Sequence, residues 1–160
     1  MGRTYYAPIN CSTAITTAID IFEILAGTGK PIKLLEIVLD QTSELGDAQE
    51  EQLEILLKRI TGAPTSGSGG PSTTTPAPVR PNDTATGVTW ENGNTTKLSG
   101  GTSIEVSRRT WNVRTDFLWT PIPDGELVID ATTRAVLELI AAPADSITKI
   151  VGHLLFEELV

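Results

Sequence analysis

The chain has 160 residues, of which 39% are hydrophobic and 5% aromatic, and its formal net charge is −8 at pH 7. One domain of this length buries about 70% of the surface of its unfolded chain, so a core forms without disulfide or metal staples. The acidic balance disfavours nucleic acid and anionic lipid as partners, and no apolar stretch reaches the roughly 20 residues that cross a bilayer.

Short apolar runs in the first 41 residues predict strands. Tyr5 and Tyr6 open an extended piece, and residues 14–25 (AITTAIDIFEIL) carry apolar side chains with a period of two. A breaker cluster at 26–31 (AGTGKP) comes next. Residues 32–41 (IKLLEIVLDQ) are apolar on both faces, which predicts a central strand pressed between two layers.

Residues 44–60 fit two structures, because their leucines and isoleucines match both a helical and a strand period. We favour a strand from about Gln52, preceded by an acidic turn around Gly46 and Asp47.

A low-complexity segment runs from Thr61 to Asp83 (TGAPTSGSGGPSTTTPAPVRPND). Its Gly, Ser and Thr favour mobility, its prolines favour extended backbone, and it has little apolar surface to bury. It is therefore predicted to be an arm or a long surface loop, an insertion at 61–87 in a single domain spanning 1–160. Because loops of this length usually reach a partner, we expect contacts at Thr65, Ser66, Pro71, Pro76, Pro78 and Arg80.

Further short strands are expected after this segment, at residues 88–90, 103–113, 127–129 and 134–141. The connections between them are a turn at 92–94, a polar stretch to residue 101, and an apolar loop at 116–123 closed by Asp124 and Gly125.

Residues 147–160 are also ambiguous. Asp145 or Ser146 could cap a helix, which Gly152 would weaken, and the same residues serve as a two-sided strand. Roughly eight short strands separated by Gly, Pro and Asn turns predict an all-β chain, a jelly-roll-like β-sandwich. The fold becomes α+β if both ambiguous segments are helical.

The sequence contains little that predicts catalysis or a cofactor. His153 is the single histidine and lies in an apolar run, where we expect a partly buried ring bonded to a neighbour. Cys11 is the single cysteine and is expected to be inert, because a catalytic thiol requires a basic partner. Residues 26–30 lack the first glycine and the Ser or Thr of a phosphate loop. We therefore expect a protein that is not an enzyme.

Six carboxylates crowd one stretch: Asp40, Glu44, Asp47, Glu50, Glu51 and Glu54. They would bind Ca²⁺ if several converged, but the spacing is not that of a calcium loop, and a solvated acidic turn is expected. Paired carboxylates for glycoside cleavage stay open, although 5% aromatic residues is thin for a sugar-stacking groove.

Arginine and tryptophan are concentrated in residues 108–119. These residue types are enriched at interface hot spots, because they combine large contact area with directional donors. The alternative places Trp111 in the core and has Trp119 pin a loop. The contact surface is predicted at Arg108, Arg109, Trp111, Arg114 and Trp119.

Taken in order, seven pieces resemble small virion proteins of tailed bacteriophages: AITTAIDIFEIL, PIKLLEIVLDQTSELGDAQEEQLEILLKRITG, the Gly/Ser/Thr/Pro segment, the WENGNTT turn, a Trp-containing strand, a Trp-Pro loop and APADSITKIVGHLLFEE. The chain looks like the jelly-roll decoration or cement proteins on the outside of icosahedral heads, commonly trimers. The resemblance implies strands at both ambiguous segments and suggests no role for Cys11.

The resemblance also implies a function. The chain would be made in the bacterial host cytoplasm, join the virion at the capsid surface, bind the major capsid protein and clamp adjacent capsid subunits, without nucleic acid or membrane partners. The Gly/Ser/Thr/Pro segment would lie across a neighbouring subunit. Two alternatives stay open: a tail, baseplate or head-fibre jelly roll that binds a host glycan, and a carbohydrate- or calcium-binding module.

Overall fold

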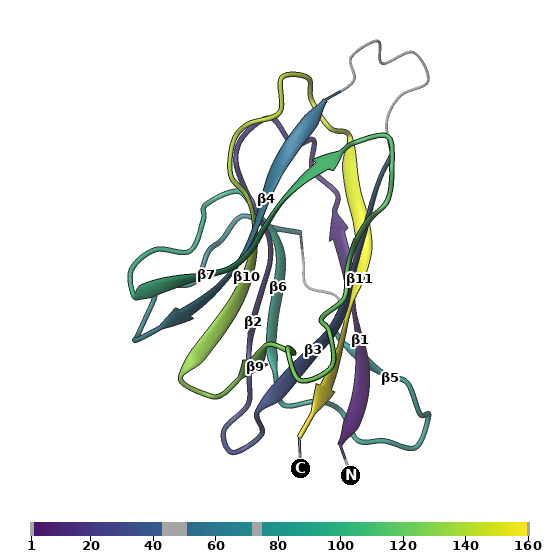
Figure 1. Cartoon of the computed structure of the whole chain (residues 1–160), viewed down its shortest axis with the longest axis vertical. Coiled ribbons are helices and arrows are strands. Elements are labelled where there is room, and N and C mark those ends of the chain that lie inside the picture. Colours follow the sequence, from purple (N-terminus) through teal and green to yellow (C-terminus); the bar gives the residue numbers. More distant parts are fainter. Residues whose placement is uncertain (1, 43–50, 72–74, 160) are drawn as a thin grey trace.

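A computed structural model describes residues 2–42, 51–71 and 75–159, and within them the chain is all-β, in two antiparallel sheets that pack together (Figure 1). The strands are β1 (Arg3–Cys11), β2 (Asp20–Leu25), β3 (Ile32–Thr42), β4 (Gln52–Thr61), β5 (Ala77–Pro78), β6 (Thr89–Asn94), β7 (Thr102–Asn112), β8 (Phe117–Trp119), β9 (Val128–Ile129), β10 (Thr133–Leu139) and β11 (Lys149–Glu158). The predicted all-β sandwich is confirmed, and in the described parts of the two ambiguous segments the chain forms the strands β4 and β11.

The strand order follows from how the chain reverses on itself. One sheet has the order β5-β1-β11-β3-β8, with β9 also paired to β3, and the other has the order β6-β2-β10-β4-β7. Thus β1, β2, β3 and β4 pair with β11, β10, β8 and β7 respectively, all antiparallel. The first four long strands alternate between the two sheets. The strands that come later in the chain pair with them in reverse order, so β7 pairs with β4 and β11 pairs with β1.

The core lies between the sheets and is built by alternation along the strands. Tyr5 stacks on Phe156 with ring centroids 5.4 Å apart, and Phe22 stacks on Trp90 at 5.3 Å. All four rings are buried. Burying each such side chain stabilises the fold by about 1.5–3 kcal/mol.

Strand β3 differs from the prediction of a strand buried on both faces. Its inner residues are buried, whereas the outward ones are half-buried or exposed. Leu35 occupies a β-bulge where the register with β11 shifts, which explains why two leucines are adjacent in sequence. The outward face of β3 is mixed, with Val38 between Glu36 and Asp40.

The predicted strand at 14–25 begins only at Asp20. Residues 12–19 instead cross from one sheet to the other, where Ile15 exchanges two backbone hydrogen bonds with Ile147 at 2.8 and 3.1 Å. Ile15 and Ile19 are buried because they close the end of the sandwich. The spacing of apolar residues at 14–19 fits a strand, but these residues form a connection that crosses between the sheets.

Two other connections were predicted wrongly. Residues 92–94, expected as a turn, belong to β6, where Gly93 has a φ of 66° and a Cβ atom would lie 3.2 Å from the Cα of Cys11. The loop expected at 116–123 contains β8. The following turn is present, with Asp124 at φ 64° and the Gly125 amide donating to the Ile122 carbonyl at 2.9 Å.

Across the part of the chain that the structure describes, no helix has the length and apolar character needed to cross a bilayer.

Candidate functional site

The predicted contact stretch at 108–119 lies where the edges of the two sheets meet. β7 is the last strand of the five-stranded sheet, and β8 is at the end of the other. The Arg109 guanidinium donates to the Leu118 carbonyl over 2.8 Å and joins the two edges. This side of the sandwich therefore exposes both sheet edges together.

Of the five predicted contact residues in this stretch, only the arginines are exposed. Arg108, Arg109 and Arg114 are exposed, whereas Trp111 and Trp119 retain 2% and 7% exposure. The Trp111 indole donates to the Thr115 carbonyl at 2.7 Å, which holds the loop after β7. The expectation that both tryptophans form the contact surface is corrected, because their inward positions fill the space between the sheets.

β7 is exposed on both of its faces. Every residue from Thr102 to Thr110 except Ser107 is exposed, so the predicted alternation does not correspond to one buried face. Ile104 and Val106 are 42% and 41% exposed. An edge strand presents unpaired backbone groups that another chain can use. A bulge at Val106 and the ion pairs of Arg108 limit indiscriminate pairing.

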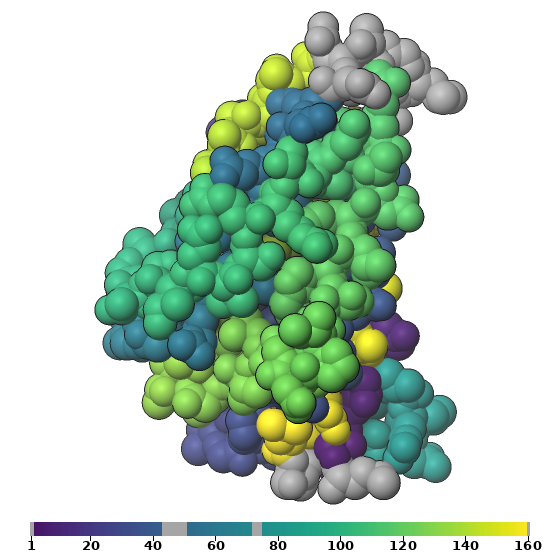
Figure 2. Space-filling view, in the orientation of Figure 1, coloured from purple at the N-terminus to yellow at the C-terminus, as the bar shows by residue number. Residues whose placement is uncertain are grey.

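The segment after β7 extends this exposed area. Figure 2 shows β7 and the chain that follows it to β9, in shades of green, as one continuous surface on the viewed face. Five of the seven large apolar side chains that are exposed among the described residues lie here: Ile104, Val106, Leu118, Ile122 and Val128. We call residues 102–129 the β7–β9 surface. Sequence analysis missed these five residues, although SIEV and PIP show apolar residues with no apolar neighbours.

The Gly/Ser/Thr/Pro segment lies on its own domain where it is described. Thr65 and Ser68 exchange backbone hydrogen bonds with Ser99 and Thr96 at 2.9–3.1 Å. Further along, β5 pairs with the start of β1. Of the two predicted forms, arm and surface loop, these residues form a surface loop.

Most of the residues predicted as contacts in this segment are thus buried, half-buried or hydrogen-bonded within the chain. Ser66 accepts a hydrogen bond from Arg134, Pro76 is buried, Pro71 and Pro78 are half-buried, and Thr65 and Arg80 are exposed. The backbone amide and carbonyl of Thr65 are nevertheless both hydrogen-bonded to Ser99.

Beneath this segment lies a layer of charge on the outer face of the five-stranded sheet. The Gly67 amide donates to Glu23 at 3.1 Å, and the Leu98 amide donates to Asp20 at 2.6 Å. Both carboxylates are at most 3% exposed. Burial raises the pKa of Asp20, against the hydrogen bond from Leu98 and the charges of nearby lysines.

Cations complete this layer. Glu138 bonds to both Lys58 and Lys97, and Arg134 bonds to Glu23. A small apolar cluster of Ile60, Leu98 and Val136 lies beside them. We call residues 62–71 and 95–101 the cover, because they close over these groups.

Glycines let the cover approach the sheet closely. A Cβ atom at Gly67, Gly69 or Gly70 would lie 2.6, 2.3 or 2.2 Å from an atom of residues 92–95. At Gly67 and Gly70 the close atoms include backbone oxygens of Thr96 and Asn92, which cannot turn aside, so both positions require glycine. At Gly69 the close atom is a side-chain hydroxyl, and the φ of 84° is what favours glycine. The composition that predicted mobility thus serves tight packing in the described part of the segment.

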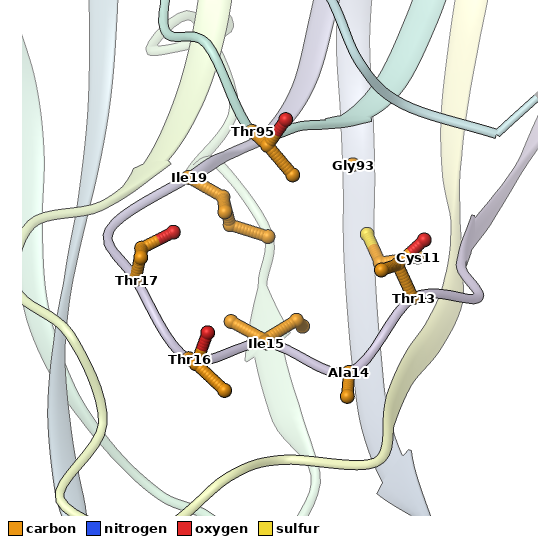
Figure 3. A pocket seen from close by; sticks show the side chains of 9 residues that line it. All are labelled: Cys11, Thr13, Ala14, Ile15, Thr16, Thr17, Ile19, Gly93 and Thr95. Carbon is orange, nitrogen blue, oxygen red and sulfur yellow. The ribbon is translucent and has the colours of Figure 1, made fainter.

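A cavity of about 280 Å³ lies under the connection between β1 and β2 (Figure 3). Ile15, Ile19 and Cys11 line it together with threonine side chains. None of the nine residues labelled in Figure 3 is charged, so this cavity brings no acid–base pair together.

We expect the Cys11 thiol to be unreactive in the folded protein. Its Sγ lies 3.7 Å from the Ile21 carbonyl oxygen, and burial raises its pKa from 9.0 to about 12. At pH 8 such a thiol has about 1,000-fold less thiolate than an ordinary one, and the thiolate is the reactive form. Dithionitrobenzoate should therefore react at least about 100-fold more slowly with native protein than with protein in urea. Equal rates in the two states would contradict a buried thiol.

The acidic run falls partly outside the described residues, which omit Glu44, Asp47 and Glu50. Glu54 pairs with Arg108 at 2.6 Å, and Glu51 accepts a hydrogen bond from the Ala144 amide. Among the residues that are described, no three His, Cys, Asp or Glu side chains are grouped to hold a metal ion.

His153 is partly exposed and bonded, as predicted. Its Nε2 lies 3.2 Å from Glu36 Oε1, and its ring meets the Tyr6 ring edge-on with centroids 5.1 Å apart. The histidine side chain points outward from the six-stranded sheet, away from the core.

Comparison of the chain with protein-family models, with curated proteins and with solved structures finds no match.

Proposed function

We propose that this chain is a non-enzymatic structural protein of a tailed bacteriophage. It binds the major capsid protein on the outside of the head and clamps adjacent capsid subunits. The observation that carries the proposal is the β7–β9 surface, an edge strand exposed on both faces beside exposed apolar side chains. Apolar surface gathered in one place marks contacts with other proteins.

The sandwich is proposed to be a jelly roll. The pairing of β1 to β4 with β11, β10, β8 and β7 supports this, because a jelly roll is an eight-stranded roll in two sheets. This support comes from the backbone alone and is independent of the resemblance in sequence.

Binding would use many weak contacts. Icosahedral symmetry repeats each contact over the head, so avidity replaces a single tight site. Three-fold self-association belongs to this proposal, as do synthesis in the host cytoplasm and final location on the capsid surface. Arg108 and Arg109 supply directional donors at the rim of the β7–β9 surface.

The proposed contact includes fewer residues of the Gly/Ser/Thr/Pro segment than the sequence predicted. Thr65 and Ser66 bond within the chain, so they are left out of the contact that we propose. Arg80 follows β5 and is exposed, and it stays in the proposal as a secondary contact.

The test is co-sedimentation of purified protein with phage heads that lack it. We expect saturable binding, and we expect Ile104→Asp with Val106→Asp to weaken it at least about ten-fold, because both place charge in an apolar contact. Val79→Asp is the matched control, since Val79 is 48% exposed on the chain next to β5.

Heads that bind no wild-type protein would overturn the proposal. Equal loss for the β7 variant and for the Val79 control would remove the β7–β9 surface from it. Binding to tails in place of heads would favour the rival function of a tail or baseplate protein.

A further inference from the structure

The outer face of the six-stranded sheet carries apolar side chains open to solvent. Tyr6 on β1 and Leu118 on β8 are 43% and 52% exposed. Between them, the outward residues Val151 and Leu155 of β11 and Val38 of β3 are half-buried. An antiparallel sheet that faces water on one side normally has polar residues there. The cover lies over the outer face of the opposite sheet, whereas on this face Tyr6 and Leu118 stay exposed.

The strand register brings these residues together. Tyr6 pairs with Leu155, and His153 pairs with Val38, which in turn pairs with Leu118. Two neighbouring rows of side chains therefore cross the sheet. Figure 1 shows β1, β11 and β3 side by side, so the rows form one area.

The outward residues of β11 are self-complementary by chemical type, because reversing their order exchanges the cation with the anion and leaves the other types in place. They are Lys149, Val151, His153, Leu155 and Glu157, in the order cation, aliphatic, histidine, aliphatic, anion. A two-fold axis through His153 would place each Lys149 opposite Glu157 of a second copy. It would also place Val151 opposite Leu155. A two-fold contact requires a surface that is complementary to itself in this way.

We propose that two copies of this chain pack these outer faces together about a two-fold axis, with their β11 strands antiparallel. Sheets that pack face to face lie about 10 Å apart with nearly aligned strands, which suits the side chains present. The occupant is a second copy because the charge pattern along β11 is self-complementary. The inference goes beyond capsid binding and does not depend on it.

Some charges on the face also have partners within their own copy, and Glu157 is one of them. Lys33 lies 3.6 Å from Glu157 and 3.9 Å from Glu126, and Glu36 lies 3.2 Å from His153. One opposing effect exists on β3, where the symmetry brings Glu36 towards Asp40 of the second copy.

The available area indicates a weak association. The ten residues of β11 extend for about 33 Å, and four strands spaced about 4.8 Å apart cover about 15–19 Å. Two such faces bury roughly 1,000–1,200 Å² in total, the lower limit for a specific interface. The contact should form at micromolar concentration or above, and it is distinct from three-fold association.

The test is sedimentation equilibrium of the full chain and two charge variants. The mass of the wild-type protein should double as concentration rises, starting from the species present at low concentration, whether that is the 17.1 kDa chain or its trimer. Lys149→Glu and Glu157→Lys should each weaken pairing at least about ten-fold, because each creates two like-charged contacts. An equimolar mixture of the two variants restores both opposite-charge contacts and should recover pairing. Recovery in the mixture also shows that both variants are folded.

Two further variants sharpen the result. Leu155→Lys should abolish pairing, because it places charge at the centre of the contact, whereas Val106→Lys on β7 should leave pairing unchanged. Wild-type protein whose mass does not rise with concentration up to 1 mM, a mixture that associates no better than either variant alone, or a concentration-dependent association that all variants retain would each overturn the proposal. No phage particle is used, so the outcome is independent of capsid binding.

Discussion

Gly152→Ala should destabilise the fold by about 3 kcal/mol or more, the largest effect that we expect from a single methyl group. Gly152 has a φ of 151°, and a Cβ atom there would lie 2.0 Å from the Val38 carbonyl oxygen. The clash is with backbone of β3, which cannot turn aside as a flexible side chain would. β11 is paired along its length with both β1 and β3, so the strain falls on the middle of the sheet.

Urea unfolding followed by tryptophan fluorescence measures this loss. Gly87→Ala is the matched control, because the nearest atom to its added Cβ is 3.6 Å away and its φ is not positive. The control should stay within about 0.5 kcal/mol of wild type. Equal stability of Gly152→Ala and Gly87→Ala would contradict the close approach of β11 and β3.

Glu138→Ala should cost about 3 kcal/mol, because it leaves two partly buried lysines without their shared anion. The side chains of Lys58 and Lys97 are 12% and 29% exposed, and both bond to Glu138, which is 11% exposed. Lys97 belongs to the cover. Its release should also increase amide exchange in residues 95–101, more than in β10 itself.

Thermal unfolding and hydrogen exchange measure the two parts of this prediction. Glu54→Ala provides the same substitution in an exposed ion pair, since Glu54 and Arg108 are 46% and 44% exposed. Exposed pairs contribute about 0–1 kcal/mol. Similar losses in the two variants, or unchanged exchange in the cover, would show that the buried charges do not hold it.

Much of the fold follows from local pattern. β1, β4, β7, β10 and β11 lie close to where alternation and turn residues predict them. The residues of β4 and β11 fit helix and strand alike, and pairing with distant strands decides between the two: β4 lies between β10 and β7, and β11 lies between β1 and β3. Such pairing is not visible in an isolated window of sequence.

The cover shows why composition alone misleads. Its glycines and serines have little apolar surface, yet Gly67 and Leu98 bond to carboxylates 44 and 78 residues away. These hydrogen bonds hold the cover on the sheet, and they join residues too far apart in sequence to be predicted from a short window. One signal was present, since Asp20 and Glu23 interrupt an otherwise apolar strand and so require partners when buried.

The structure exposes only some of the residues that were predicted as a contact surface. Arg108 and Arg109 are exposed at the joined sheet edges, whereas Trp111 and Trp119 are inside. Residue type alone does not distinguish a tryptophan in a core from one at an interface. The exposure of Ile104 and Ile122 depends on how the strands and loops pack, which the sequence does not show.

Electron cryomicroscopy of phage particles saturated with this protein tests the central proposal most directly. The account predicts density for the β-sandwich on the outer surface of the head, with the β7–β9 surface against the capsid shell. Density on the tail alone, or a sandwich seated on the capsid through the cover, would contradict it.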